Sequence, residues 1–439
     1  AAQLVVEESD ELFAFRHALT RQAIYSELLA RERKALHRTM GETMERLYVS
    51  MLDAHLADLA YHFYEAGAWE KALKYAQRAG EKAQTLYAPY ASLDHFSHAL
   101  HAASHLSENP PPALFHARGM AYELLGEFER ARADYEASLS IARTTNNRQA
   151  EWEALLSLGM LWTGRNYERS GEYYQHAFEL ARTIGDSSIL ARSLNRIGNW
   201  HLNVARPLEA VQYHQQALSI FQELQDVRGI AETLDLLGMT SYLGGDLVQG
   251  TAYYEQAVDL FRELDDRQGL TSSLATMLLR GVTYQTDTMV SASTNLDEVV
   301  SSGEQALKIA REIGQRSAEA YAFLLLGDFL GPHGEYAPAL EYAQKSLEIA
   351  EEIEHRQWIT AANCVLGALY RDMLDFSTAR QRCEQALAIA KEIGSFFWIH
   401  CSTGYLATTY ILQNELERAE CILNAALDPN TPVQTLGQR

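Results

Sequence analysis

Small and large apolar residues follow one another in a fixed order along this chain, and the order returns about every forty residues. Its clearest marker is a small residue followed directly by a large apolar one, at Ser138-Leu139, Ala177-Phe178, Ala217-Leu218, Ala257-Val258, Ala306-Leu307, Ser346-Leu347, Ala386-Leu387 and Ala426-Leu427. The second members of successive pairs are 39, 40, 40, 49, 40, 40 and 40 residues apart. Such a period is typical of a solenoid, whose units bury their apolar faces against their neighbours. The pattern therefore predicts an array of eight copies.

Each copy carries two apolar stripes with helical spacing. In residues 207–224, apolar side chains return at three- and four-residue steps and so lie on one face of a helix, as Ala210, Tyr213, Ala217, Phe221 and Leu224. Pro207 suits the first turn of that helix, where its missing N–H costs nothing. The stripe upstream consists of Ala191, Leu194 and Ile197. We therefore expect two helices per copy, joined by a tight turn.

A glycine recurs in the middle of the first helix of most copies, at Gly119, Gly159, Gly198, Gly238, Gly327 and Gly367, with Ala407 in the last copy. Glycine in a helix interior costs about 0.5–1 kcal/mol relative to alanine, so we expect a close approach of two helices to compensate. A small residue follows twelve positions later, at Ala131, Gly171, Ala210, Gly250, Ala339, Ala379 and Ala419.

This order of large and small residues resembles the tetratricopeptide repeat, most completely in residues 118–139, where Gly119, Tyr122, Gly126, Ala131 and Tyr135 precede Ser138-Leu139. The resemblance implies an all-α, right-handed superhelical solenoid of helix pairs. The copies depart from the family pattern in length, with about forty residues instead of thirty-four. An earlier copy is expected over roughly residues 53–86.

One copy is irregular. Leu278 stands where glycine is due, and nine extra residues enter before Leu307. The segment 281–302 is rich in Thr, Ser and Asp, which favours an enlarged turn. A solenoid tolerates such an insertion on one face, and a loop that faces a binding partner is the alternative interpretation.

The first fifty residues do not follow the repeat. Residues 4–7 and 12–15 are expected to form a small hairpin around Asp10-Glu11. Two helices should follow, the first with its apolar residues Leu19, Ile24, Tyr25, Leu28 and Leu29 inside, the second carrying Leu36, Met40 and Leu47. We expect four segments: residues 1–50, a helical arm with the first repeat over 51–109, the solenoid over 110–428, and a tail over 429–439.

The string Phe15-Arg16-His17-Ala18-Leu19, with Tyr25, Arg33 and Glu45 after it, resembles a segment of the bacterial STAND proteins, which are signal-transduction ATPases with numerous domains. In that family the segment ends a winged-helix domain and begins a helical arm. The resemblance implies that an NTPase module precedes Ala1 in a longer protein, and that His17 contacts nucleotide only in that protein. The alternative for His17 is a structural role at the start of a helix. The chain itself has no G-x-x-x-x-G-K-[ST] motif.

Composition narrows the classes of partner. A net charge of −21 disfavours nucleic acid as a partner, because phosphate binding needs clustered positive charge. The sequence contains no run of about 18 apolar residues, which is the length that a membrane-spanning helix needs. The four cysteines lie at Cys364, Cys383, Cys401 and Cys421, a spacing that matches no zinc motif. We expect reduced, buried thiols in a cytoplasmic protein.

No spacing of residues predicts catalysis. The sequence has none of the motifs of serine hydrolases or zinc proteases, and no pair of its 58 carboxylates stands out as an acid and base. His98, His101 and His105 share one helical stripe, and His101 with His105 could offer two ligands to zinc. Two ligands are too few for a tight site, so a polar helix face is the favoured interpretation. We expect no enzyme activity, no cofactor and no metal in this chain.

The surface that carries function in this repeat class is the concave one, lined by the first helix of each copy. The register places Arg192, Asn195, Asn199, Leu202 and Asn203 there in one copy, and Glu232, Asp235, Met239, Tyr242 and Leu243 in the next. Asn195, Asn199 and Asn203 form an i, i+4, i+8 ladder. Because an amide both donates and accepts, such a column can pair with an extended peptide backbone. The alternative is a solvated groove.

Two functions from different classes fit these observations. The first is a sensor that binds a peptide or protein inducer through Arg192, Asn195, Asn199, Asn203, Glu232, Asp235 and Tyr242, and that controls the release and self-assembly of the NTPase module. The second is a static protein-interaction scaffold without a switch. Membranes and nucleic acids are not expected as partners of either.

Overall fold

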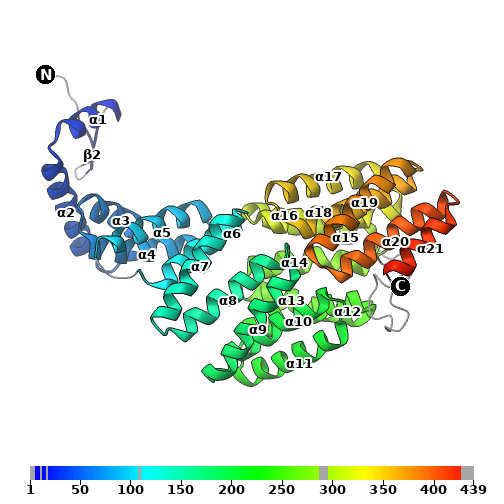
Figure 1. Cartoon of the computed structure of the whole chain (residues 1–439). Coiled ribbons are helices and arrows are strands. Elements are labelled where there is room, and N and C mark those ends of the chain that lie inside the picture. Colours follow the sequence, from blue (N-terminus) through cyan, green and yellow to red (C-terminus); the bar gives the residue numbers. More distant parts are fainter. Residues whose placement is uncertain (1–4, 10–11, 16–17, 107–109, 286–294, 427–439) are drawn as a thin grey trace. The chain divides into compact units, whose positions relative to one another are not determined.

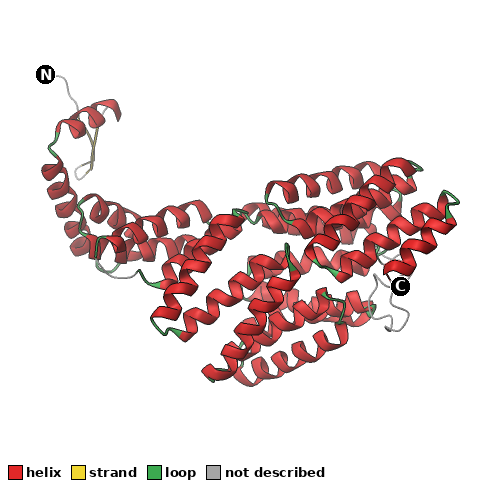
Figure 2. Cartoon of the chain, in the orientation of Figure 1, coloured by secondary structure: helices red, strands yellow, loops and turns green. Residues whose placement is uncertain are grey.

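The computed structural model describes residues 5–9, 12–15, 18–106, 110–285 and 295–426, and within these ranges nearly every element is a helix (Figures 1 and 2). Contacts divide the chain into two compact units, Ala1–Arg118 and Gly119–Arg439. Helix α6, Pro112–Leu124, crosses this division. His17 and the tail from residue 427 lie outside the described residues.

The first unit begins with the predicted hairpin. Strands β1 (Val5–Ser9) and β2 (Leu12–Phe15) pair antiparallel, with Val5 opposite Phe15 and an irregularity between Glu7 and Ser9. Helices follow in the order α1 (Ala18–Glu27), α2 (Ala30–Leu47), the short 3-10 helix η1 (Leu52–His55), α3 (Leu56–Glu65), α4 (Trp69–Thr85) and α5 (Pro89–Ser104). A core cluster that includes Phe63, Tyr75 and Phe96 holds α3, α4 and α5 together.

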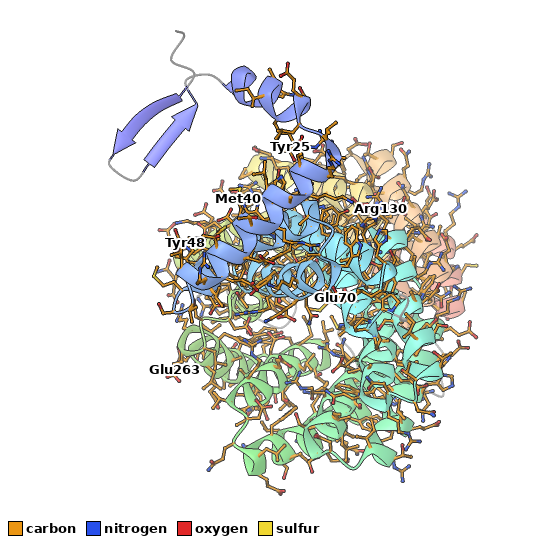
Figure 3. All side chains as sticks on the ribbon, turned by 90° about the vertical axis from the view of Figure 1, so that its left-hand side faces the viewer. Tyr25, Met40, Tyr48, Glu70, Arg130 and Glu263 are labelled. Carbon is orange, nitrogen blue, oxygen red and sulfur yellow. The ribbon has the colours of Figure 1, made fainter. Side chains whose placement is uncertain are left out.

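The apolar residues expected inside the two helices after the hairpin are in part exposed, which corrects the prediction. Ile24 and Leu29 are 40% and 56% exposed, and Leu36, Met40 and Leu47 of α2 are all more than half exposed. Figure 3 labels Met40 on this helix. In the described residues α2 packs along α3 through His37 and Gly41, which are its buried residues.

From α6 onward the described helices form eight pairs, which confirms the predicted all-α solenoid. The pairs are α6 with α7 (Phe128–Thr144), α8 (Arg148–Thr163) with α9 (Tyr167–Ile184), α10 (Ser187–Asn203) with α11 (Pro207–Leu224), α12 (Val227–Gly244) with α13 (Leu247–Glu263), α14 (Arg267–Thr276) with α15 (Leu296–Glu312), α16 (Arg316–Leu330) with α17 (Tyr336–Glu352), α18 (Arg356–Asp372) with α19 (Phe376–Ile393), and α20 (Phe396–Leu412) with α21 (Leu416–Ala426). Each pair packs on the next, as the shared apolar stripes require.

The recurring glycines let the two helices of a pair approach closely, as predicted. A Cβ on Gly159 would lie 2.5 Å from the ring of Tyr174 on the second helix, and one on Gly198 would lie 2.7 Å from His214. In the same way Gly119 faces Tyr135, Gly238 faces Tyr254 and Gly367 faces Cys383. The loss of helix propensity at each glycine is thus offset by a buried side chain that packs against bare backbone.

The connectors between pairs have a common chemistry. The residue that ends the second helix of a pair often has a positive φ, as at Gly185 (81°) and Gln225 (56°). An Asp or Asn after it often caps the next helix. Asp186 accepts from the backbone N–H of Ile189 at 3.0 Å, and Asp226 does the same for Gly229. These caps fix where each first helix begins.

The irregular copy has a shortened first helix. Helix α14 ends at Thr276 and continues as the 3-10 helix η2, Met277–Arg280, which includes the Leu278 that replaces glycine. Leu278 is fully buried, so a large side chain fills the space that a close helix partner occupies elsewhere. Residues 286–294 of the predicted enlarged turn lie outside the described residues, and α15 resumes at Leu296.

Two further expectations concern cysteines and membranes. Cys364, Cys383 and Cys401 are buried free thiols, whereas Cys421 is exposed, so the prediction of a buried thiol is wrong for Cys421. Among the described residues no helix combines the length and the apolar character that a membrane crossing requires.

Candidate functional site

A cavity of about 350 Å³ lies inside the second unit, between helices far apart in sequence. One wall comes from the ends of α8, α10 and α12, with Met160, Thr163, Gly164, Asn199, Leu202, Asn203, Met239 and Leu243. The opposite wall comes from the first half and middle of α16 and from the first turns of α18 and α20, with Ser317, Tyr321, Leu324, Leu325, Gln357, Trp358, Phe397 and Trp398. Figure 1 shows the first group in green and the second in yellow to orange.

The two walls meet because the superhelical turn closes on itself. The guanidinium of Arg165, after α8, donates to the carbonyl oxygen of Ile353 at 2.8 Å, and the backbone N–H of Gln357 donates to the carbonyl oxygen of Gly164 at 2.9 Å. Gly126 and Gly164 have no side chain, and their backbones lie against Ile353 and the His355 ring. We call this contact between residues 164–165 and 353–357 the ring closure.

The cavity is partly aromatic and rich in amides. Trp358 stacks on Tyr321 with ring centroids 4.7 Å apart and on His355 at 5.0 Å, and Phe397 meets Trp398 edge to face. Five side-chain amides line the same space, those of Asn199, Asn203, Gln285, Gln315 and Gln357. Apolar surface with a few convergent polar groups is typical of sites for small ligands.

Two members of the predicted asparagine ladder lie in this cavity. Asn199 and Asn203 both line it, as does Met160 of the preceding copy. Asn203 is engaged on both sides of its amide, because it accepts from the Tyr167 hydroxyl at 2.9 Å and donates to the Asn199 carbonyl at 2.9 Å. The Asn199 amide has no partner among the described residues, and its binding to a ligand stays a prediction.

The third member, Asn195, lies in the core, which corrects the expectation that it faces a ligand. Its side chain is 4% exposed, donates to the Thr233 hydroxyl at 2.8 Å and bonds Nδ1 of His214 at 3.2 Å. Tyr242 also differs from the expectation, because it is fully buried against Gly250 and bonds the Thr251 hydroxyl. Both side chains join neighbouring helices and do not line the cavity.

Arg192, Glu232 and Asp235 also lie outside the residues that line the cavity. The Asp235 carboxylate accepts from the Ser273 hydroxyl at 2.5 Å, a bond from α12 to α14, and burial raises the pKa of Asp235 to about 6. Arg192 and Glu232 are only partly buried. In these two copies the residues three and six positions before the glycine therefore face neighbouring helices or solvent, whereas Tyr321 and Leu324, at the same offsets from Gly327, line the cavity.

Several lining residues were not among the predicted ones. Arg196 lies two positions before Gly198, and Glu123, His355, Trp358 and Trp398 come from copies that the sequence analysis did not join to this site. The sequence signal available was the register itself, since Gly164 and Leu243 sit at the same offset from their glycines as Asn203. In the opposite wall Tyr321 and Leu324 lie six and three positions before Gly327, whereas the residues from α18 and α20 lie near the helix starts, at offsets that the repeat does not mark.

Burial controls the charges around the cavity. Burial raises the pKa of Glu123, although the hydroxyl of Tyr135, which donates to it at 2.6 Å, and the nearby Arg165 and Arg196 act in the opposite sense. Burial lowers the pKa of His355 to about 3, helped by the positive charge of Arg165. His355 is therefore neutral near pH 7, and it packs against Gly164 without adding a second cation to the ring closure.

The histidine stripe of α5 packs against aromatic residues. His105 stacks on Trp69 with centroids 4.1 Å apart, and the Tyr64 hydroxyl bonds Nδ1 of His101 at 2.9 Å. Among the described residues no group of three or more His, Cys, Asp and Glu side chains has an arrangement suited to a metal ion.

Comparisons with known proteins support the repeat assignment. Family models described as tetratricopeptide repeat match residues 112–145 and 159–223. No curated protein sequence matches the chain significantly.

Solved structures resemble it at low identity. The Rap conjugation gene regulator of plasmid pLS20, in complex with the Phr* peptide, is 14% identical over 82% of this chain and 92% of its own, with a TM-score of 0.49. The apo quorum sensor NprR from B. thuringiensis is 12% identical over 75% and 91%, also at 0.49. The STAND protein PH0952 from Pyrococcus horikoshii, which has a tetratricopeptide repeat sensor, is 16% identical over 93% and 67%, at 0.42. Sequence identities and TM-scores this low do not assign a ligand or a function. The fold and the family matches together identify the chain as an all-α solenoid that contains tetratricopeptide repeats.

Proposed function

We propose that this chain is the ligand-sensing array of a regulatory protein and that its ligand, a peptide or part of a protein, binds in the cavity. The observation that carries the proposal is the ring closure, because it places two walls from distant copies around one space of about 350 Å³. A ligand in that space touches α10 and α12 on one side and α18 and α20 on the other. It therefore interacts differently with a closed and an opened turn.

The mechanism is a shift of population between those two arrangements. A ligand that bridges the walls favours the closed turn by the free energy of the contacts that opening would break. To move the closed fraction from 1:99 to 99:1, the ligand must prefer that arrangement by about 5.5 kcal/mol. Contacts with the cavity lining can supply this difference in binding free energy. They include the aromatic stack of Tyr321, Trp358 and His355 and the side-chain amides.

The regulated module in this proposal is an NTPase on the N-terminal side of the array, as in the STAND proteins that residues 15–45 resemble. Occupancy of the cavity would release that module and allow it to assemble, and the array itself would perform no catalysis. The hairpin followed by α1 and α2 supports the proposal, since the resemblance implies that order of elements. The alternative is a static scaffold, for which the cavity would be a structural interior without a switch.

The test is to compare ligand capture by the array and by an obstructed variant. Asn199→Trp places a large ring in the cavity from a partly buried position whose amide has no partner among the described residues. Arg192→Trp, two turns earlier on the same helix and outside the cavity, is the matched control. Each protein is incubated with a peptide and metabolite extract of its host, and retained compounds are identified by mass spectrometry.

A ligand retained by the wild type and by Arg192→Trp, but lost from Asn199→Trp, supports the cavity as the site. Equal retention by all three proteins would place binding elsewhere. The switch is tested separately, by adding the retained ligand to the full-length protein and measuring nucleotide hydrolysis and oligomer size. Capture without any change in either quantity supports the static scaffold.

A further inference from the structure

Arg196 is a cation in the lining of the cavity whose guanidinium makes no hydrogen bond with the described residues. It lies on α10 among the lining residues, and in the part of the chain that the structure describes its guanidinium makes neither a hydrogen bond nor an ion pair. Arg165, the neighbouring cation, donates to two carbonyl oxygens and lies over the Phe128 ring. The guanidinium donors of Arg196 are therefore available for charge-assisted hydrogen bonds to an anionic group of a ligand.

The carboxylates of Glu123 and Asp235 act electrostatically on Arg196 but form no ion pair with it in the described residues. Glu123, which lines the cavity, accepts from the Tyr135 hydroxyl, and Asp235 accepts from the Ser273 hydroxyl. Neither carboxylate takes up the hydrogen-bond donors of Arg196, which leaves these donors for a ligand.

Two residues that line the cavity each carry a buried polar atom without a hydrogen-bond partner in the described residues. Trp398 is 5% exposed, and its Nε1 donor is buried without an acceptor; the Oε1 acceptor of Gln315 is buried without a donor. Buried polar atoms are nearly always hydrogen-bonded in folded proteins, and leaving one unsatisfied destabilises the structure. A group that offers both a carbonyl oxygen and an N–H, such as an amide, would satisfy both atoms.

From these three atoms we infer that the cavity binds a carboxylate, held by Arg196, on a ligand that also carries an amide for Trp398 and Gln315 and an apolar body for the aromatic wall. Two sources share this chemistry, the C-terminal end of a peptide and a free N-acylated amino acid. The size of the cavity, near the lower end of the range of small-ligand pockets, suits either. The inference rests on the proposed function for the location of the site, and it names the class of ligand.

The experiment uses pairs of probes that differ only in charge. N-acetylphenylalanine and its amide represent the free acid, and the tripeptide Ala-Ala-Phe and its C-terminal amide represent the peptide end. Binding of each probe to the whole chain is measured by ligand-observed NMR and equilibrium dialysis into the millimolar range. A glucose trisaccharide is the uncharged polar probe.

We expect one or both acids to bind at least about tenfold more tightly than the matching amide, a difference of ~1.4 kcal/mol. Arg196→Gln should abolish that preference and Arg196→Lys should restore part of it, because lysine keeps the charge but not the two-pronged geometry. Arg192→Gln, on the same helix outside the cavity, should leave the preference intact. Thermal unfolding of each variant verifies that it is folded.

Which acid binds more tightly tells the two sources apart. Equal binding of acid and amide, an undiminished preference in Arg196→Gln, tighter binding of the trisaccharide, or no binding of any acid would each overturn the inference. The proposed function is judged by a different result, the loss of captured ligand in Asn199→Trp. Capture of a neutral ligand at the cavity would therefore contradict the carboxylate site but still support the proposed sensing function.

Discussion

Arg165 and Ile353 are 188 residues apart in sequence, and the guanidinium of the first donates to the carbonyl oxygen of the second at 2.8 Å. The same guanidinium donates to the Leu161 carbonyl oxygen and lies 4.0 Å from the centre of the Phe128 ring. Burial lowers the pKa of Arg165 to about 10, so its charge persists at neutral pH. One side chain therefore ties the end of α8 to the turn between α17 and α18.

Replacing Arg165 with Met should loosen the ring closure. The variant keeps much of the apolar stem but loses both charge-assisted hydrogen bonds, and we expect a loss of about 1–3 kcal/mol in the free energy of unfolding. Amide hydrogen exchange in residues 353–358 should become faster, because local opening needs less free energy there. Arg169→Met is the control, since Arg169 is exposed and its one ring contact is with Trp162. Unchanged exchange in Arg165→Met would contradict the role of this contact.

The asparagine ladder divides into residues with different roles. Asn195→Ala removes a buried amide that joins Thr233 and His214, so we expect a loss of about 1–3 kcal/mol in stability. Asn199→Ala should change stability by no more than about 0.5 kcal/mol, because its side chain has no partner among the described residues. Urea unfolding of the two single variants measures the difference.

The repeat pattern was enough to predict the helix pairs. Spacing, the mid-helix glycines and the connector residues each act within one copy or between adjacent copies, so local physics determines them. Gly198 and His214 illustrate this, because the glycine predicts a close approach of two helices and the structure puts the ring of His214 against it.

Only one wall of the cavity could be predicted from the sequence. Asn199 and Asn203 follow from the register, but their opposite wall depends on how much twist accumulates over several copies. The irregular copy changes the accumulated twist, because α14 ends at Thr276 and η2 replaces its last turn. No residue of the repeat encodes which distant copies meet, so Trp358 and Trp398 could not be joined to Asn199 from the sequence.

Substitution of two helix glycines should have opposite effects. Gly159→Ala brings a Cβ to 2.5 Å from the Tyr174 ring, and we expect overpacking to cost about 1–3 kcal/mol. Gly404→Ala, in α20, meets no atom within 4 Å and should gain about 0.5–1 kcal/mol from helix propensity. Thermal unfolding of both variants measures the signs. Stabilisation of both proteins would show that the helices of the α8–α9 pair approach less closely than described.

His214 should make the stability of the array depend on pH. It is fully buried, and burial, with the nearby Arg196, lowers its pKa to about 3. The unfolded chain has the ordinary pKa of about 6.5, so between these values the unfolded state binds more protons and stability falls as the pH falls. At pH 5 this one residue should cost about 2 kcal/mol relative to pH 7.5.

His214→Tyr isolates that contribution, because tyrosine occupies the equivalent place at Tyr135, Tyr174 and Tyr254 and does not titrate in this range. The loss of stability between pH 7.5 and pH 5, measured by urea unfolding, should be smaller by about 2 kcal/mol in the variant than in the wild type. His355 and Asp235, whose pKa values are also shifted, titrate alike in both proteins, so they cancel from the difference. Replacement of the exposed His176 with Gln should leave the pH dependence unchanged. If His214→Tyr and the wild type lose the same stability on acidification, His214 accepts a proton in the folded state and is not held neutral by burial.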